Sequence, residues 1–302
     1  MRAVRLGMET EVLRYAAFSS DPGGGNPAGI VLDAAGLGDA EMLRIAAGVG
    51  FSETAFLTPP PADLDAPPGR GFTVRYFSPL AEVAFCGHAT VATAVVLAER
   101  IGPGEMVFST PAGVVPVTVT EQDGAPYATL ISVEPHTSEV AGDDLAEALA
   151  ALDWAPSDLD PALPPAIANA GNDHLVIAAT SRERLADLDY DFDRLKALME
   201  RRGLTTVQLV WRASKTVFHV RDPFPVGGVV EDPATGAAAA AFGAYLRAKG
   251  VVPLDESAQL TLHQGDDMGR PSLLTVGLLA GDPRVRVSGS ATRLDSVEEQ
   301  VA

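Results

Sequence analysis

Two apolar segments constrain the fold of this 302-residue chain more than any other feature of its sequence. The stretches ATVATAVVLA (residues 89–98) and AAAAAFGAYL (residues 237–246) are apolar all round and lack the polar face of a surface helix. Each follows a glycine-containing turn with polar residues, FCGHAT in the first half and EDPATG in the second. We therefore expect two helices that are buried on every side, each wrapped by a sheet.

The remaining pattern predicts more strands than helices, and several strands are joined by turns of hairpin length. This disfavours a doubly wound parallel sheet and favours curled, barrel-like sheets of mixed or antiparallel strands. At about 150 residues per domain, the length predicts two domains. We place the first over 1–127 and the second over 128–287, and expect the last strand, about 288–302, to return to the first. The predicted fold class is α+β, with two similar domains that each surround a central helix.

Composition narrows the range of partners and compartments. The 22 Lys and Arg against 40 Asp and Glu give a net charge of −18, which opposes binding to nucleic acid or anionic membranes. The longest apolar runs are shorter than the roughly 18 residues of a membrane span. A single cysteine, Cys86, excludes an intramolecular disulfide. The N-terminus lacks the apolar core of a secretory signal, so we expect a cytoplasmic protein.

The two turns that precede the apolar helices carry groups suited to binding an anion. Backbone N–H groups at a helix start are unpaired and lie at the positive end of the helix dipole. Gly87 and Gly236 allow a ligand to approach that backbone, although either can be an ordinary turn residue. His88 and Asp232 add titratable groups at the same turns, where each can instead act as a cap or turn former.

Glu53 stands out in the stretch FSETAFL. Read as a strand, this stretch places Phe51, Glu53, Ala55 and Leu57 on one face, so an acid occupies an apolar row. A buried carboxylate needs a partner or a function. It can be a structural acid paired with a neighbour, or, with His88 and Asp232, part of a set of groups for proton transfer.

Five motifs, in order and spacing, resemble the PhzF-like phenazine-biosynthesis isomerase family, which is related to diaminopimelate epimerase. They are GNPAGIVL, GFSETAFL, FCGHATVATAVVL, EDPATGAAAAAFGAYL and QGDDMGRPSLL, and they span nearly the whole chain. The resemblance implies two domains, each a sheet or barrel around a central helix, with an active site in the cleft between them. It also implies an isomerase of a small carboxylate-bearing substrate, and we expect a homodimer.

Residue by residue, the resemblance makes Glu53 the general acid and base that moves a proton between carbons. His88 and Asp232 would assist it and position the substrate, and the backbone at Gly87 and Gly236 would hold the substrate carboxylate. A shielded carboxyl at 53 could both take and return a proton. These roles are what the resemblance implies, and they answer why an acid occupies the apolar row.

Two positions depart from the family pattern. Ala237 stands where the family often has serine, so a substrate contact by that hydroxyl is absent. Cys86 resembles one of the two thiols of related racemases, but one cysteine cannot support a two-thiol mechanism, and we expect a buried, inert thiol. Asn26 can reach the cleft or serve its turn, and Arg270 can pair with a substrate acid or with a surface carboxylate.

No cofactor is expected. The other histidines lack the i, i+4 spacing of a helical metal pair, so we predict no metal site; they are His136, His174, His219 and His263. No GxGxxG or GxxxxGK[ST] motif indicates a nucleotide. Two alternatives to a cofactor-independent isomerase remain open: a non-catalytic ligand-binding or assembly protein, and a racemase or epimerase that uses Glu53 with a second base.

Overall fold

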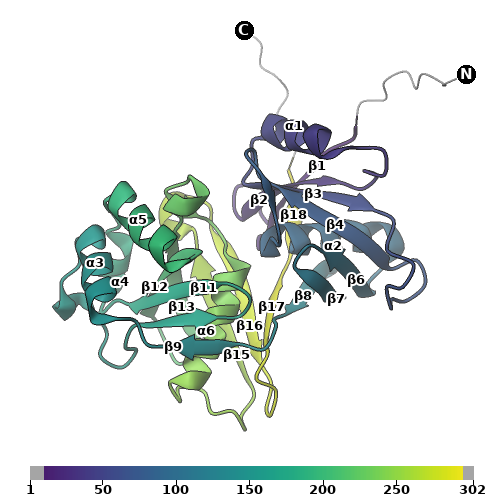
Figure 1. The fold of residues 1–302 in the computed structure, drawn as a ribbon. Coiled ribbons are helices and arrows are strands. Elements are labelled where there is room, and N and C mark those ends of the chain that lie inside the picture. The colour runs from purple at the N-terminus through teal and green to yellow at the C-terminus, as the bar shows by residue number, and fades with distance from the viewer. Residues whose placement is uncertain (1–9, 295–302) are drawn as a thin grey trace, which may run out of the picture.

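The computed structural model describes residues 10–294. Figure 1 shows two lobes, each with strands around one helix. The helix of the first lobe is α2 (Gly87–Ile101), and that of the second lobe is α6 (Gly236–Ala248). The predicted fold class, α+β with mixed sheets that curl around buried helices, describes this arrangement.

The first lobe is built from strands that alternate between antiparallel and parallel pairing. β1 pairs with β2, β3 with β4, and β6 with β7 in antiparallel fashion, whereas β2–β3 and β4–β6 are parallel. The strands are β1 (Leu13–Ala17), β2 (Asn26–Val31), β3 (Glu53–Thr58), β4 (Gly71–Phe77), β5 (Glu82–Val83), β6 (Gly104–Thr110), β7 (Gly113–Gln122) and β8 (Ala125–Ile131).

The second lobe repeats this mixture. β11–β12 and β13–β15 are parallel, and the other pairs are antiparallel. Its strands are β9 (His136–Ser138), β10 (Ala166–Asn169), β11 (Asp173–Ala178), β12 (Thr206–Arg212), β13 (Val217–Pro223), β14 (Glu231–Asp232), β15 (Ala258–Gln264), β16 (Ser272–Leu278) and β17 (Val285–Gly289). Single 3-10 turns are η1 (Pro156–Asp158), η2 (Pro225–Gly227) and η3 (Asp266–Met268).

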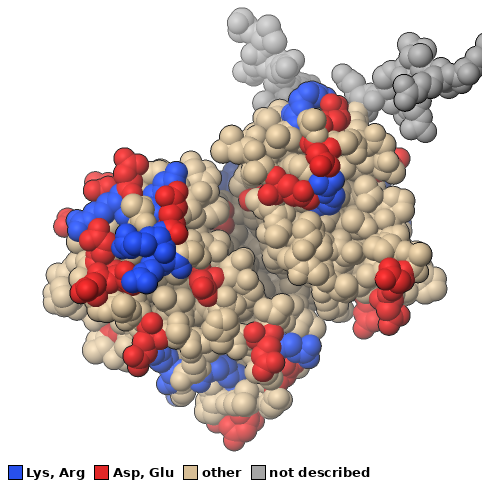
Figure 2. Space-filling view, in the orientation of Figure 1, with Lys and Arg blue, Asp and Glu red and all other residues tan. Residues whose placement is uncertain are grey.

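Outer helices cover the second face of some strands. α1 (Asp39–Val49) packs Met42 and Ile45 on Phe56, while Ala55 and Leu57 face the core that contains α2. β3 is therefore buried on both faces rather than in a single apolar row. In the second lobe, the covering helices are α3 (Gly142–Leu152), α4 (Arg182–Ala186) and α5 (Phe192–Arg202). Charged side chains gather over this region in the space-filling view (Figure 2).

The two central helices are buried because their side chains are small and apolar. α2 is buried from His88 to Ala98, and five alanines of α6 are less than a tenth exposed. Gly243 lets α6 lie close against β16 and β17, since a Cβ at this position would lie 2.9 Å from side-chain atoms of both Val276 and Val285. Among residues 10–294, no helix is long and apolar enough to cross a membrane.

Two strand pairings join the lobes. β8 pairs antiparallel with β17, and β18 (Ala291–Arg293) pairs antiparallel with β1. The last described strand therefore returns to the first lobe, as expected. Residues 295–302 of the predicted strand lie outside the described residues. The predicted boundary between residues 127 and 128 falls inside β8, so the division into two domains at that point stays a prediction.

Candidate active site

The two buried helices begin beside each other. A Cβ placed on Gly87 would lie 3.8 Å from both the Cα of Gly236 and the backbone nitrogen of Ala237. In the described chain, no side chain caps the start of either helix. First-turn N–H groups carry the positive end of each helix dipole, so this junction suits a bound anion. The sequence predicted that these two glycine turns would face a common site.

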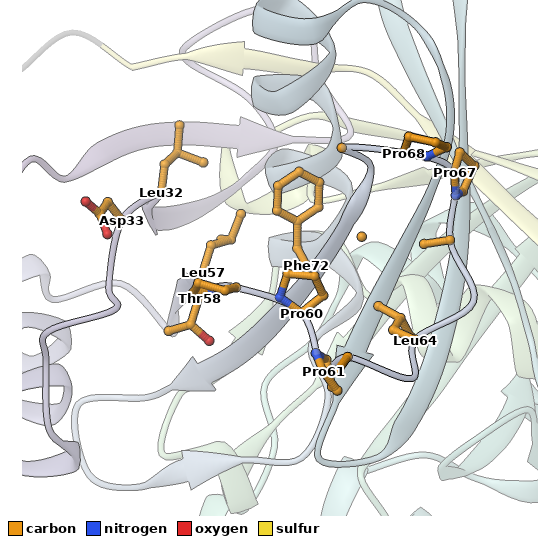
Figure 3. A pocket seen from close by; sticks show the side chains of 15 residues that line it. Leu32, Asp33, Leu57, Thr58, Pro60, Pro61, Leu64, Pro67, Pro68 and Phe72 are labelled. Carbon is orange, nitrogen blue, oxygen red and sulfur yellow. The ribbon is translucent and has the colours of Figure 1, made fainter.

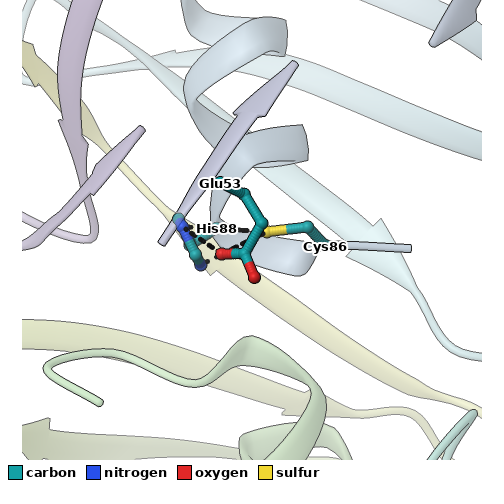
Figure 4. Close-up of side chains that lie close together, drawn as sticks. All are labelled: Glu53, Cys86 and His88. Atoms are coloured by element: carbon teal, nitrogen blue, oxygen red, sulfur yellow. Dashed lines mark hydrogen bonds and ion pairs between the residues drawn. The ribbon is translucent and has the colours of Figure 1, made fainter. Parts of the chain in front are cut away.

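Glu53, Cys86 and His88 form a compact cluster at this junction (Figure 4). Glu53 is the first residue of β3, and its side chain is 15% exposed. Its Oε2 lies 3.4 Å from Nε2 of His88 and 3.6 Å from Sγ of Cys86. The hydroxyl of Ser52 is also 3.4 Å from Nε2 of His88. The Glu53 carboxylate is therefore largely shielded but still reachable from outside.

Asn26, the first residue of β2, connects the two lobes at this site. Its buried amide nitrogen donates to Oδ1 of Asp232 at 2.8 Å and to the carbonyl of Ala234 at 3.0 Å. The same nitrogen lies 3.2 Å from Nδ1 of His88. The amide has two protons, and the two closer oxygens take them, while Nε2 of the same His88 ring faces the Glu53 carboxylate. Asn26 thus orders His88 and Asp232 together.

Asp232 is held by residues of its own lobe as well. The hydroxyl of Thr235 donates to Oδ2 of Asp232 at 2.6 Å. The side-chain amide of Gln264 donates to the Asp232 carbonyl and accepts from the Thr235 N–H. Burial raises the pKa of Asp232 to about 6, although His88, Thr235 and Asn26 act to lower it. Thr235 stands inside the EDPATG motif and Gln264 opens the QGDDMGRPSLL motif, yet neither was predicted as a site residue, because no local pattern links them to Asp232.

Cys86 is buried, and burial together with the nearby Glu53 carboxylate raises the pKa of its thiol well above the usual value. The thiol therefore keeps its proton and can donate it in a hydrogen bond to Glu53. Donor atoms of Glu53, Cys86 and His88 lie within 4.8 Å of one another, close enough for a metal ion. In this structure the same atoms contact one another, with the thiol donating to Glu53 and the His88 ring 3.4 Å from that carboxylate.

The predicted substrate contact of Arg270 stays a prediction, and the described residues give its side chain backbone partners. Its guanidinium donates to the carbonyls of Gly24 and Gly25 at 2.6 and 2.9 Å. Within the described part of the chain, no carboxylate pairs with it. It holds the glycine-rich loop that leads into Asn26, because a flexible Gly-Gly-Gly segment needs an external anchor. Ala237 lies at the start of α6, where its half-buried methyl group offers no hydrogen bond.

A separate hollow lies at the far end of β3 (Figure 3). It has a volume of about 590 Å³ and is lined mainly by the proline-rich loop after β3, together with Leu57, Leu64 and Phe72. Leu57 is four residues along the strand from Glu53, roughly 13 Å at the usual rise. Asp33 is the one charged residue that lines it. The hollow thus lacks the paired polar groups found at the helix junction.

The whole chain is similar to one family of enzymes. The family model described as phenazine biosynthesis-like protein matches residues 15–296. An uncharacterized isomerase of Bacillus subtilis is 31% identical, covering 94% of this chain and 96% of the relative. Trans-2,3-dihydro-3-hydroxyanthranilate isomerase of Pseudomonas chlororaphis is 30% identical, covering 93% and 92%.

Solved structures point to the same family. The crystal structure of the Bacillus anthracis phenazine biosynthesis protein of the PhzF family is 28% identical and superposes with a TM-score of 0.82, covering 94% of this chain and 96% of that one. The resemblance that the five motifs predicted is thereby confirmed, as are the α+β fold class and the prediction of an enzyme. The chain belongs to the PhzF family of phenazine biosynthesis-like proteins and is an isomerase of that family.

Proposed function

We propose that this isomerase moves a proton between two carbons of a small carboxylate-bearing substrate, with Glu53 as the acid and base and without a cofactor. One observation carries the proposal: Asn26 brings His88 of one lobe and Asp232 of the other together beside Glu53, where two helix starts meet. A structural acid would need only its own partner. This arrangement supplies a shielded base next to a site for an anion.

The chemistry requires no group beyond those residues. The substrate carboxylate binds the backbone N–H groups at Gly87 and Gly236, which also stabilise the negative charge that develops when a neighbouring C–H bond breaks. The ionised Glu53 takes that proton and becomes a carboxylic acid, then returns a proton to a second carbon as the double bond shifts. His88 lies with Nε2 3.4 Å from the Glu53 carboxylate and orients it. Asp232 of the second lobe accepts a hydrogen bond from Asn26 and helps to position the substrate from that lobe.

Ala237 limits the range of substrates. Where a serine hydroxyl at this position could bond a polar substituent, the methyl group of Ala237 offers only apolar contact. We therefore expect a substrate that places an apolar group, or nothing, beside the start of α6. The substitution Ala237→Ser should widen the accepted carboxylates toward hydroxylated or aminated compounds.

The test combines a ligand screen with isotope exchange. Small carboxylic acids that bind the folded protein raise its melting temperature, because binding shifts the unfolding equilibrium. Each acid that does so is incubated with the protein in D2O and analysed by mass spectrometry and NMR. The proposal predicts deuterium at a carbon that becomes saturated while a double bond moves. Binding without any exchange would indicate a non-catalytic protein, and deuterium only at an inverted stereocentre would indicate an epimerase.

A further inference from the structure

A buried polar cluster lies inside the second lobe, behind Asp232. It consists of His174 on β11, Thr206 and Gln208 on β12, and Asp222 on β13, each with 0% exposure. His174 is the register partner of Thr206. Since Leu209 is opposite Arg221, Gln208 follows one step along the same register opposite Asp222. The four side chains therefore share one face of three neighbouring strands.

That face is the apolar one around α6. Val176, Val210 and Val220 lie two residues from members of the cluster on the same strands, and they belong to the core that contains α6. A polar side chain at such a position is stable only when its hydrogen-bonding atoms are paired.

Three side chains of the cluster form a chain of hydrogen bonds from His174 through Thr206 to Asp222. The Thr206 hydroxyl donates to Oδ1 of Asp222 at 2.8 Å, and it lies 2.8 Å from Nδ1 of His174. A hydroxyl has one proton, so Thr206 accepts from Nδ1–H of His174 and leaves Nε2 of that ring as a bare acceptor. Burial lowers the pKa of His174 to about 4, and the ring is neutral at physiological pH.

The other atoms of the cluster have no partner in the described residues. These atoms are Nε2 of His174, Oδ2 of Asp222 and both amide atoms of Gln208. They include both donors and acceptors, on strands that lie side by side. Water is the small molecule that satisfies such a mixture, and buried waters in proteins bond groups of this kind. The geometry thus points to a hydration site rather than to a dry core.

Asp222 is linked to the candidate active site through Thr235. The pairing of β13 with β14 makes Asp222 the register partner of Asp232. The Thr235 hydroxyl donates to Asp232 and also lies close enough to Asp222 to influence its pKa. The charged groups around Asp222 are the carboxylates of Asp232 and Glu231, and Glu231 is already paired with Arg221 at 2.6 Å.

An ionised Asp222 would therefore compete with Asp232 for the single proton of Thr235. Burial and the two nearby carboxylates raise the pKa of Asp222 well above its usual value, which agrees with an uncharged acid. Its Oδ1 already accepts from Thr206, so the acid proton belongs on Oδ2, where it needs an acceptor. A water molecule among the unpaired atoms provides that acceptor.

We propose that His174, Gln208 and Asp222 enclose an internal water site, and that Asp222 is a positioning residue for Asp232. As an uncharged acid bonded to that water, Asp222 leaves the Thr235 proton on Asp232. Asp222 is fully buried beside Asp232 in register and has no place in the proton transfer itself. The inference goes beyond the proposed function, and it can be tested without a substrate.

The first test follows the Asp side-chain carboxyl carbons by 13C NMR against pH. In the wild type, Asp222 keeps the chemical shift of a protonated acid while Asp232 titrates. Asp222→Asn, an uncharged mimic, moves the Asp232 midpoint by less than about 0.3 pH unit. If Asp222 is ionised alongside Asp232, removing its charge lowers that midpoint by about one unit or more, and the proposal is overturned. Should Asp222→Asn fail to fold, the wild-type titration decides.

The second test distinguishes a hydrated cluster from a dry one. Gln208→Leu removes two hydrogen-bonding atoms, and its control is Thr93→Val, which removes an isolated buried hydroxyl of α2 that also lacks a partner. If Gln208 bonds water, Gln208→Leu lowers the melting temperature by roughly 2–4 °C or more, while Thr93→Val changes it little. A Gln208→Leu variant more stable than the wild type, or a high-resolution crystal structure without water beside Asp222, would refute the water site.

Discussion

Asp232 owes its properties to neighbours that are far away in the sequence. It is 7% exposed, and its carboxylate receives hydrogen bonds from Asn26 of the first lobe and from Thr235 three residues later. The motif EDPATG marked the residue as a candidate, but its burial and its partner in the other lobe depend on how the lobes meet. The local sequence could predict the group and not its protonation.

The raised pKa of Asp232 predicts a specific dependence of stability on pH. Its folded pKa of about 6 exceeds the ordinary 3.8, so the native state holds a proton that the unfolded chain has lost between these values. The stability that this proton contributes is present below about pH 4 and is lost as the pH rises to 6, by about 3 kcal/mol in all.

We therefore expect the stability of Asp232→Asn, relative to the wild type, to improve steadily from pH 4 to 6 and to level off above that. Urea unfolding at a series of pH values measures the difference. A difference that is constant with pH would show that Asp232 ionises as an ordinary surface acid does.

Cys86 should react slowly with thiol reagents in the native protein. Its side chain is buried and the pKa of its thiol is raised, whereas the thiolate is the reactive form. Ellman's reagent should label the denatured chain at once and the folded chain only at the rate of opening, and Cys86→Ala should remove the signal. Rapid labelling of folded protein would instead make Cys86 a candidate for chemistry.

At the level of elements, the central helices were the most predictable part of the fold. An all-apolar helix has one stable environment, so the sequence alone predicted that α2 and α6 are buried. The role of α1 was harder to foresee, because the strand around Glu53 reads as one apolar row, while its other face is covered by a helix from earlier in the chain. Whether a strand is buried on both faces depends on which helices pack against its sheet, and the local sequence of the strand does not specify this.

Two glycines within helices test the packing of the central helices. A Cβ at Gly243 of α6 would meet Val276 and Val285 at 2.9 Å, whereas a Cβ at Gly48 of α1 meets nothing within 4 Å. Gly243→Ala should destabilise the protein by roughly 1–3 kcal/mol through overpacking. Gly48→Ala should stabilise it by up to about 1 kcal/mol through helix propensity. Thermal denaturation compares them, and similar effects at both sites would contradict close packing around α6.

Across the whole molecule, the contacts that assemble the site join distant parts of the chain. Asn26 and Asp232 are 206 positions apart, and Arg270 anchors a loop 246 positions earlier. No local pattern encodes such pairs. Residue chemistry proposed the set Glu53, His88 and Asp232, and the family resemblance assigned each a role, because it carries long-range information that periodicity lacks. For Arg270 the sequence left a substrate acid and a surface carboxylate as alternatives, and its bonds to the carbonyls of Gly24 and Gly25 emerge only from the fold.

Arg270 should therefore affect the stability and order of the Asn26 loop. Arg270→Ala removes two charged hydrogen bonds to the carbonyls of the buried Gly24 and Gly25, and we expect a loss of about 2–3 kcal/mol with faster hydrogen exchange over residues 23–29. Arg44→Ala is the control, because its pair with Glu41 is exposed and screened by solvent, so its loss should change the stability little. If Arg270→Ala matches this control and loop exchange is unchanged, the anchoring role is wrong.

The proposed proton transfer by Glu53 is tested most directly by Glu53→Gln. Glutamine keeps the shape of the side chain and can still bond to His88, but it cannot accept a proton from carbon. With an acid from the isotope screen as substrate, turnover per folded molecule should fall by about 10²–10⁴-fold while the melting temperature stays close to that of the wild type. A variant that is destabilised but isomerises at the wild-type rate would make Glu53 a structural acid and contradict the proposed mechanism.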